Sequence, residues 1–75
     1  MARIKITYCK PCGYAARAQR LAAALDAKLG LEAELVAGTG GIFEVSVDDK
    51  VVVKRARTGF PTEEDVLTAV AAAVG

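Results

Sequence analysis

The chain has 75 residues, 53% of them hydrophobic and 25% charged, which excludes a disordered protein and allows one small domain over residues 1–75. Ten basic and nine acidic residues give a net charge of +1, so neither nucleic acid nor an anionic membrane is expected as a partner. No apolar run approaches the roughly 20 residues of a membrane span, and none follows the charged first residues as in a signal peptide. We therefore expect a soluble, cytoplasmic protein.

The first half of the chain predicts a strand, a turn, a helix and a second strand. Residues 3–8 alternate polar and apolar side chains, as in a strand with one buried face. Apolar side chains then recur every three or four residues from Tyr14 to Leu29, and Gly30 is a helix stop signal. Residues 31–37 alternate again, which favours a strand–helix–strand unit with two parallel strands.

The second half predicts a hairpin and a helix. Residues 43–47 and 51–55 form two further strands, and the short segment 48–50 between them requires an antiparallel pair. Thr62 and Asp65 have the spacing of a capping box. The buried face of the last helix is predicted to consist of Val66, Leu67, Val70 and Val74. The fold class is therefore α/β, in the order β-α-β-β-β-α, with a four-stranded mixed sheet.

The chain has no histidine and only two cysteines, Cys9 and Cys12, which limits the kinds of catalytic and metal site that it can form. Without histidine, a serine–histidine triad and a zinc site of mixed Cys and His ligands are excluded. A secreted disulfide scaffold of this size carries about four to eight cysteines. In a cytoplasmic chain, the two-residue spacing indicates redox or metal chemistry.

The predicted position of the cysteines favours redox chemistry. Cys9 ends a predicted strand and Cys12 opens a predicted helix, where unpaired backbone amides stabilise a thiolate. Lys10, and Arg17 on the first turns of the helix, add positive charge, while Pro11 stiffens the turn. One thiolate attacks a substrate disulfide and the second thiol resolves the mixed disulfide, so both cysteines are candidate catalytic residues.

Three other interpretations of the cysteines are open. A structural disulfide across so short a loop adds only about 2 kcal/mol, and the cytosol would reduce it. A copper or zinc site is the design of small heavy-metal domains, but these place methionine two residues before the first cysteine, where this chain has Thr7. The third interpretation is a non-catalytic module whose redox state controls binding to a partner protein.

Three motifs carry a resemblance to a known family. Residues 8–14 (Tyr-Cys-Lys-Pro-Cys-Gly-Tyr), 38–45 (Gly-Thr-Gly-Gly-Ile-Phe-Glu-Val) and 58–61 (Thr-Gly-Phe-Pro) resemble the selenoprotein W-type (Rdx, SelT/SelW/SelH) family. The likeness covers essentially the whole chain. It implies a thioredoxin-like fold and a thiol-dependent redox role, with no bound cofactor and with glutathione as co-substrate. The partners it implies are a thiol or disulfide substrate, either glutathione or a protein.

The resemblance leaves the identity of the nucleophile open. The selenium atom of selenocysteine-containing members corresponds to Cys12, whereas thioredoxins use the first cysteine of the motif, here Cys9. Thioredoxins also place a cis-proline before the strand that corresponds to residues 43–47. This chain has Gly38 to Gly41 there instead, so substrate docking need not follow the thioredoxin pattern.

The predicted substrate-binding residues surround the thiols. They are Tyr8, Lys10, Pro11, Gly13, Tyr14, Gly38, Thr39, Gly40, Gly41 and Phe60. For the aromatic residues, packing in the core is the alternative, and for the glycine segment, a plain connection. Outward, solvated positions are predicted for Glu44 and for the basic side chains Lys50, Lys54, Arg55 and Arg57.

Overall fold

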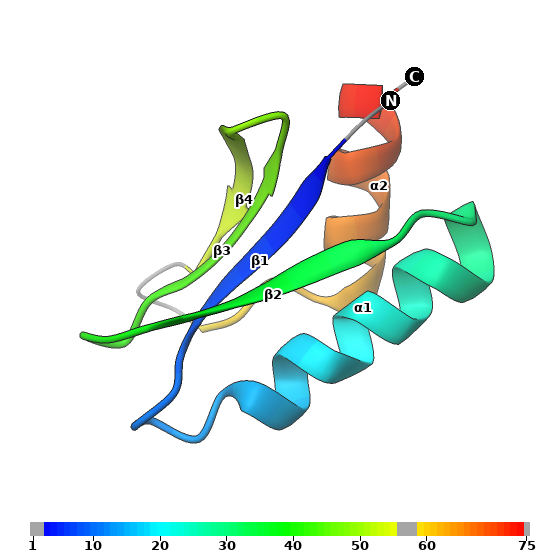
Figure 1. Cartoon of the computed structure of the whole chain (residues 1–75). Coiled ribbons are helices and arrows are strands. Elements are labelled where there is room, and N and C mark those ends of the chain that lie inside the picture. Colours follow the sequence, from blue (N-terminus) through cyan, green and yellow to red (C-terminus); the bar gives the residue numbers. More distant parts are fainter. Residues whose placement is uncertain (1–2, 56–58, 75) are drawn as a thin grey trace.

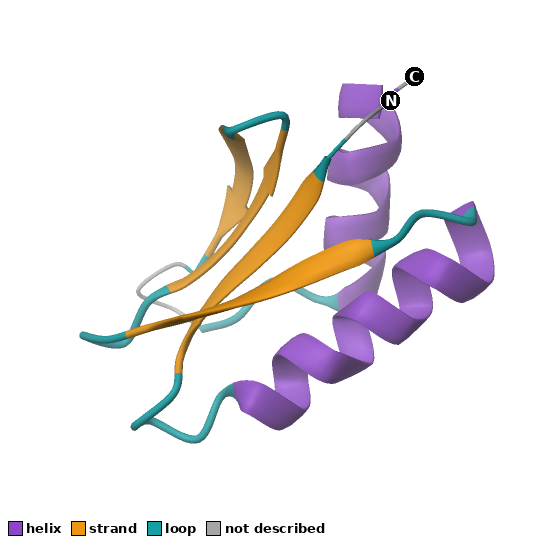
Figure 2. Cartoon of the chain, in the orientation of Figure 1, coloured by secondary structure: helices purple, strands orange, loops and turns teal. Residues whose placement is uncertain are grey.

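The computed structural model of the protein describes residues 3–55 and 59–74. Within these ranges the elements are β1 (Ile4–Cys9), α1 (Ala15–Leu29), β2 (Ala33–Gly38), β3 (Phe43–Val47), β4 (Lys50–Lys54) and α2 (Glu63–Val74) (Figure 1). Strands and helices follow one another in the predicted order, which Figure 2 shows by colour. The α/β class and the element order are therefore confirmed. Neither helix in the described ranges is long and apolar enough to cross a bilayer.

The four strands form one mixed sheet in the order β2-β1-β3-β4. β1 pairs in parallel with β2, and β3 pairs antiparallel with β4, as predicted. β1 also pairs antiparallel with β3, a contact between the two halves of the chain that the local patterns did not predict. β1 is therefore a central strand, and its carboxyl end at Cys9 lies beside Gly38, the last residue of β2. This register brings the cysteine motif next to the glycine-rich segment.

Both helices cover the same face of the sheet, because they contact each other and share one hydrophobic core with the strands (Figure 1). The largest buried side chains of that core come from β1, β3 and both helices: Ile4, Ile6, Phe43, Val45, Leu25, Val66 and Val70. Alternate residues of β3, such as Glu44, are half-buried on the opposite face. Val74, predicted to be buried, is 37% exposed, because it lies in the last turn of α2 at the rim of a hollow.

The boundary between α1 and β2 is set by Gly30. Its left-handed conformation (φ 64°) lets its N–H bond the carbonyl of Asp26, while the N–H of Leu31 bonds the carbonyl of Leu25 at 3.2 Å. Leu31 is thereby engaged by the helix end and cannot join the sheet. β2 consequently begins at Ala33, two residues later than the alternation predicts.

The hairpin between β3 and β4 turns on Asp48 and Asp49, whose φ angles of 52° and 69° are both left-handed. Such angles match the primed turns that join strands through two residues, so Lys50 already belongs to β4. The ladder shifts between Val45 and Ser46, which pair with Val53 and Val51 respectively. β4 therefore runs over Lys50–Lys54, one residue earlier than predicted.

The capping box of α2 is confirmed. The N–H of Asp65 bonds the Thr62 Oγ1 at 3.0 Å, and the N–H of Thr62 bonds the Asp65 Oδ2 at 3.3 Å. Glu63, Glu64 and Asp65 place negative charge in the first turn, where the helix dipole favours it. Local sequence alone thus fixes the start of this helix.

Candidate functional site

The two cysteines lie at the carboxyl end of β1 and form a disulfide, with their Cα atoms 5.3 Å apart. Cys9 is the last residue of β1, as expected, and its N–H bonds the carbonyl of Ile42 at 2.7 Å. Cys12 lies in the turn predicted between the first strand and the helix, but the expectation that it opens the helix is wrong. Gly13, at φ 80°, cannot belong to a helix, so α1 begins only at Ala15.

The two cysteines differ in exposure. Cys9 is 0% exposed, whereas Cys12 is exposed, together with Lys10, Pro11 and Gly13 of the same turn. An external molecule can therefore reach residue Cys12 but not residue Cys9. Local patterns did not predict this difference, because the burial of Cys9 depends on how the end of β1 packs against distant segments.

The glycine-rich segment is attached directly to the cysteine turn. The carbonyl of Gly38 accepts a hydrogen bond from the N–H of Lys10 at 3.1 Å. A Cβ atom at Gly38 would lie 2.8 Å from the Cγ2 of Ile42, so a side chain does not fit between the two segments. Gly40 and Gly41 both have left-handed φ angles, and Thr39 is exposed. The predicted proximity of this segment to the thiols is therefore present, and glycine is required there for close packing.

Three aromatic rings form a cluster next to the cysteine turn. The ring of Phe60 lies edge-on to Tyr14 at 4.8 Å and to Phe43 at 5.3 Å between centroids. All three pack against the hydrophobic core, as does Tyr8, which pairs with Phe43 across the sheet. Core packing therefore accounts for the four aromatic residues, while Tyr14 and Phe60 also remain partly accessible. Thr58, part of the motif that contains Phe60, lies outside the described residues.

Two arginines that the motifs do not include stand at this cluster. The guanidinium carbon of Arg17 lies 3.9 Å from the centre of the Phe60 ring, and that of Arg55 lies 5.9 Å away. Arg17, expected beside the thiols, thus stacks on an aromatic ring. Arg55 was expected only on a solvated strand, because no local pattern relates it to Phe60. Arg57 of the same basic stretch lies outside the described residues.

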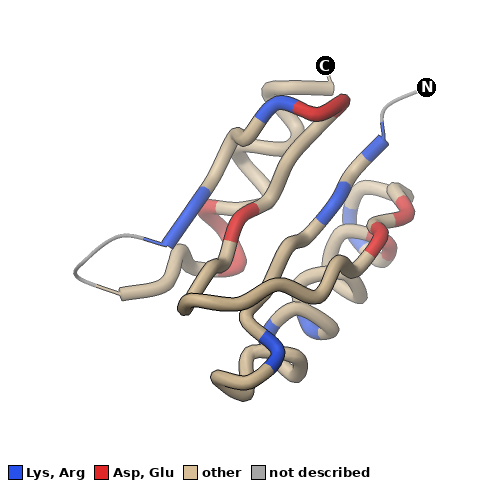
Figure 3. Tube along the Cα trace, turned by 60° about the vertical axis from the view of Figure 1, so that its left-hand side comes forward, with Lys and Arg blue, Asp and Glu red and all other residues tan. Residues whose placement is uncertain are grey.

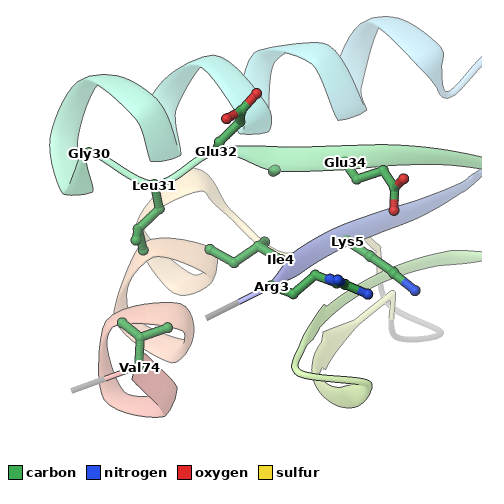
Figure 4. A pocket seen from close by; sticks show the side chains of 9 residues that line it. Arg3, Ile4, Lys5, Gly30, Leu31, Glu32, Glu34 and Val74 are labelled. Carbon is green, nitrogen blue, oxygen red and sulfur yellow. The ribbon is translucent and has the colours of Figure 1, made fainter. Parts of the chain in front are cut away.

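A hollow of about 1250 Å³ lies at the amino end of β1, the end opposite to the cysteines. Figure 4 shows Ile4, Leu31 and Val74 on the side of α2, with Arg3, Lys5 and Glu34 along the strands. Its lining includes neither cysteine. Within residues 3–55 and 59–74, no cluster of three or more His, Cys, Asp or Glu side chains is arranged to hold a metal ion.

Comparison with known proteins places this site in a family. Residues 3–72 match the model of the Rdx family, a range that includes every strand, α1 and all but the last two residues of α2. The chain belongs to the Rdx family. The resemblance seen in the three motifs is therefore confirmed.

Solved structures of similar proteins show the same fold. A selenoprotein W-related protein from Vibrio cholerae is 29% identical, with a TM-score of 0.82 over 99% of this chain and 98% of that one. A protein from Bordetella parapertussis of known crystal structure is 32% identical, with a TM-score of 0.88 over 96% of both chains. The thioredoxin-like fold expected of an Rdx protein is thus confirmed.

Curated relatives are longer than this chain. The proteins named migration and invasion enhancer 1 from Bos taurus and from Mus musculus are each 36% identical to it, over 70 and 69 residues. The match covers 91% and 89% of this chain, but the chain spans only about three fifths (61% and 60%) of those relatives.

Proposed function

We propose that this Rdx protein carries out thiol–disulfide exchange, with Cys12 as the nucleophile and Cys9 as the resolving thiol. The observation that supports this assignment is the difference in exposure, 0% for Cys9 against an exposed Cys12. Attack on an external disulfide requires access to the attacking sulfur, whereas resolution requires only the neighbouring sulfur. The motif resemblance implies the same assignment, because Cys12 corresponds to the selenium position of selenocysteine-containing members.

The reaction proceeds in two displacements from the reduced protein. The Cys12 thiolate attacks one sulfur of a disulfide R–S–S–R, whose S–S bond breaks, and R–S⁻ leaves and takes up a proton. The Cys9 thiolate then attacks the Cys12 sulfur of the mixed disulfide and releases the second R–S⁻, which is also protonated. The substrate gains two electrons and becomes two thiols, while the protein is oxidised to the Cys9–Cys12 disulfide. Two molecules of a monothiol, glutathione in our proposal, reverse the exchange and complete the cycle.

The start of α1 supports a thiolate at Cys12. Tyr14 occupies the N-cap position without a side-chain cap, and the first turn contains no acidic residue. The amides of that turn are therefore not capped by a side chain, and a helix start of this kind favours a nearby anion. Lys10, exposed within the turn itself, adds a positive charge.

Our predicted substrate-binding residues remain those that surround the thiols. They are Tyr8, Lys10, Pro11, Gly13, Tyr14, Gly38, Thr39, Gly40, Gly41 and Phe60. A reducing compartment such as the cytoplasm suits this chemistry.

Trapping with single-cysteine variants tests the assignment. Reduced Cys9→Ser should react with glutathione disulfide to give a stable mixed disulfide at Cys12, because no thiol is left to resolve it. Cys12→Ser should give none, because Cys9 is inaccessible. Intact-mass and peptide mass spectrometry identify the adduct, and the wild-type protein should instead form its internal disulfide. An adduct in Cys12→Ser but not in Cys9→Ser would reverse the roles, and no adduct in either would remove exchange as the function.

A further inference from the structure

The two guanidinium groups at Phe60 are held in place in different ways. Arg17 stacks on the ring at 3.9 Å from its centre, the geometry of a close cation–π contact. Arg55 lies 5.9 Å from the same centre, and its Nε donates a hydrogen bond to the carbonyl of Gly41 at 3.1 Å. Both arginines are nevertheless exposed to solvent. The charged groups are therefore oriented but accessible.

This arginine pair lies next to the cysteine turn. The ring of Phe60 contacts that of Tyr14 at 4.8 Å, and Tyr14 is two residues after Cys12, so their Cα atoms are at most about 7 Å apart. Gly41, the hydrogen-bond partner of Arg55, directly precedes Ile42, whose carbonyl accepts the N–H of Cys9. Arg17 is thus linked through Phe60 to the residue that follows the cysteine turn, and Arg55 is linked through Gly41 to the neighbour of Cys9 in the hydrogen-bond network.

The charge of the pair is not neutralised by a carboxylate within the described residues. The ion pairs found there are Lys5–Asp49 and Lys28–Glu63, and neither involves Arg17 or Arg55. Basic and acidic positions are interspersed over the rest of the trace (Figure 3), in keeping with a net charge of +1. A guanidinium presents a planar set of donors that matches a carboxylate, and prior stacking reduces the entropy lost when it binds.

We propose that Arg17 and Arg55 form a carboxylate-binding site beside Cys12, which selects disulfides that carry carboxylate groups. This inference rests on the proposed exchange function and names its substrate class. A carboxylate held by the guanidinium groups would bring the S–S bond of the substrate to the exposed sulfur of Cys12. The displacement steps themselves are unchanged, with the carboxylate-bearing thiolate as the leaving group.

Three aliphatic disulfides of similar size but different charge test the selection. They are 3,3′-dithiodipropionate (dianionic), bis(2-hydroxyethyl) disulfide (neutral) and cystamine (dicationic). The second-order rate constant for oxidation of the reduced protein is measured with each by stopped-flow thiol counting. We expect the ratio of the dianion rate to the neutral rate to fall about threefold for Arg17→Met or Arg55→Met, and about tenfold for the double variant. Added salt should lower the same ratio in the wild type.

Arg20→Met is the matched control. Arg20 is exposed on the same helix and its loss changes the net charge by the same amount, so the ratio should stay near the wild-type value. Arg17→Lys keeps the charge but not the planar group, and should retain part of the preference. An unchanged ratio in the double variant, or an equal fall in Arg20→Met, would overturn the carboxylate site while leaving exchange intact. Failure of the wild type to react with any of the three disulfides would instead overturn the exchange function itself.

Discussion

The two ends of β1 offer contrasting candidates for a functional site. The amino end borders a hollow of about 1250 Å³ lined by charged residues such as Arg3, Lys5, Glu32 and Glu34. The carboxyl end carries the disulfide, with one cysteine buried and the other exposed on a turn. Disulfide exchange needs an open line of approach to one sulfur rather than an enclosing cavity. Under the proposed exchange function, the size of a hollow is therefore a poor guide to the position of the chemistry.

The two ends are also stabilised differently. At the amino end, the N–H of Asp48 donates a hydrogen bond to the carbonyl of Arg3, and the N–H of Arg3 donates one to the Asp48 Oδ1, each at 2.8 Å. At the carboxyl end, backbone hydrogen bonds join the cysteine turn to Gly38 and Ile42. We therefore expect a change in the glycine segment to alter the reactivity of the thiols, and a change at the hollow to leave that reactivity as it is.

The largest effect is expected for Gly38→Ala. A Cβ atom there would lie 2.8 Å from the Cγ2 of Ile42, so the segment must shift, at a cost of up to about 3 kcal/mol in the free energy of unfolding. The rate of Cys12 oxidation should change too, because Gly38 is bonded to Lys10. Gly30→Ala is the control at the other end of the molecule. It should cost about 1 kcal/mol through its positive φ alone and leave the rate unchanged. Equal rate effects of the two variants, measured beside urea unfolding, would contradict the contrast.

Reduction of the disulfide should lower the free energy of unfolding by about 2 kcal/mol, the amount expected for a loop closed between Cys9 and Cys12. Urea unfolding with and without a reductant measures the difference. Cys12→Ser, which cannot form the bond, should show no dependence on the reductant. The same stability for oxidised and reduced wild-type protein would show that the turn does not depend on the bond.

Thr62→Ala removes the side-chain cap of α2 and should cost about 1 kcal/mol. Thr68, exposed within the same helix, is the control, and Thr68→Ala should leave stability unchanged or slightly raised because alanine favours helix. Neither variant should alter the rate of Cys12 oxidation by more than about twofold. A large loss of rate in Thr62→Ala would mean that the start of α2 belongs to the site.

The smallest effect is expected for Glu32→Gln at the hollow. Glu32 is exposed, so its neutralisation should change the free energy of unfolding by no more than about 0.5 kcal/mol. The rate with each of the three charged or neutral disulfides should be that of the wild type. A changed rate would bring the hollow into the reaction and remove the distinction between the two ends of β1.

Local patterns predicted most of the elements but misplaced their boundaries where longer-range bonds intervene. The alternation of side chains predicted that β2 begins at Leu31, two residues too early. Leu31 is instead hydrogen-bonded to the end of α1. The turn of the hairpin was predicted to be one residue longer than it is. The left-handed Asp48 and Asp49 are sufficient to reverse the chain direction. In both places, a hydrogen bond or a backbone angle outweighed the hydrophobic period.

The sequence by itself determined the order of elements, the capped helix, the two-cysteine turn and the membership in the Rdx family. These depend on side-chain periodicity and on spacing within a few residues, which the chain carries locally. Only the tertiary structure decided that Cys9 is buried while Cys12 is exposed, and that Arg17 and Arg55 meet at Phe60. Exposure and such contacts depend on which distant segments pack together, and residues 17, 55 and 60 become neighbours only when both helices close over the sheet.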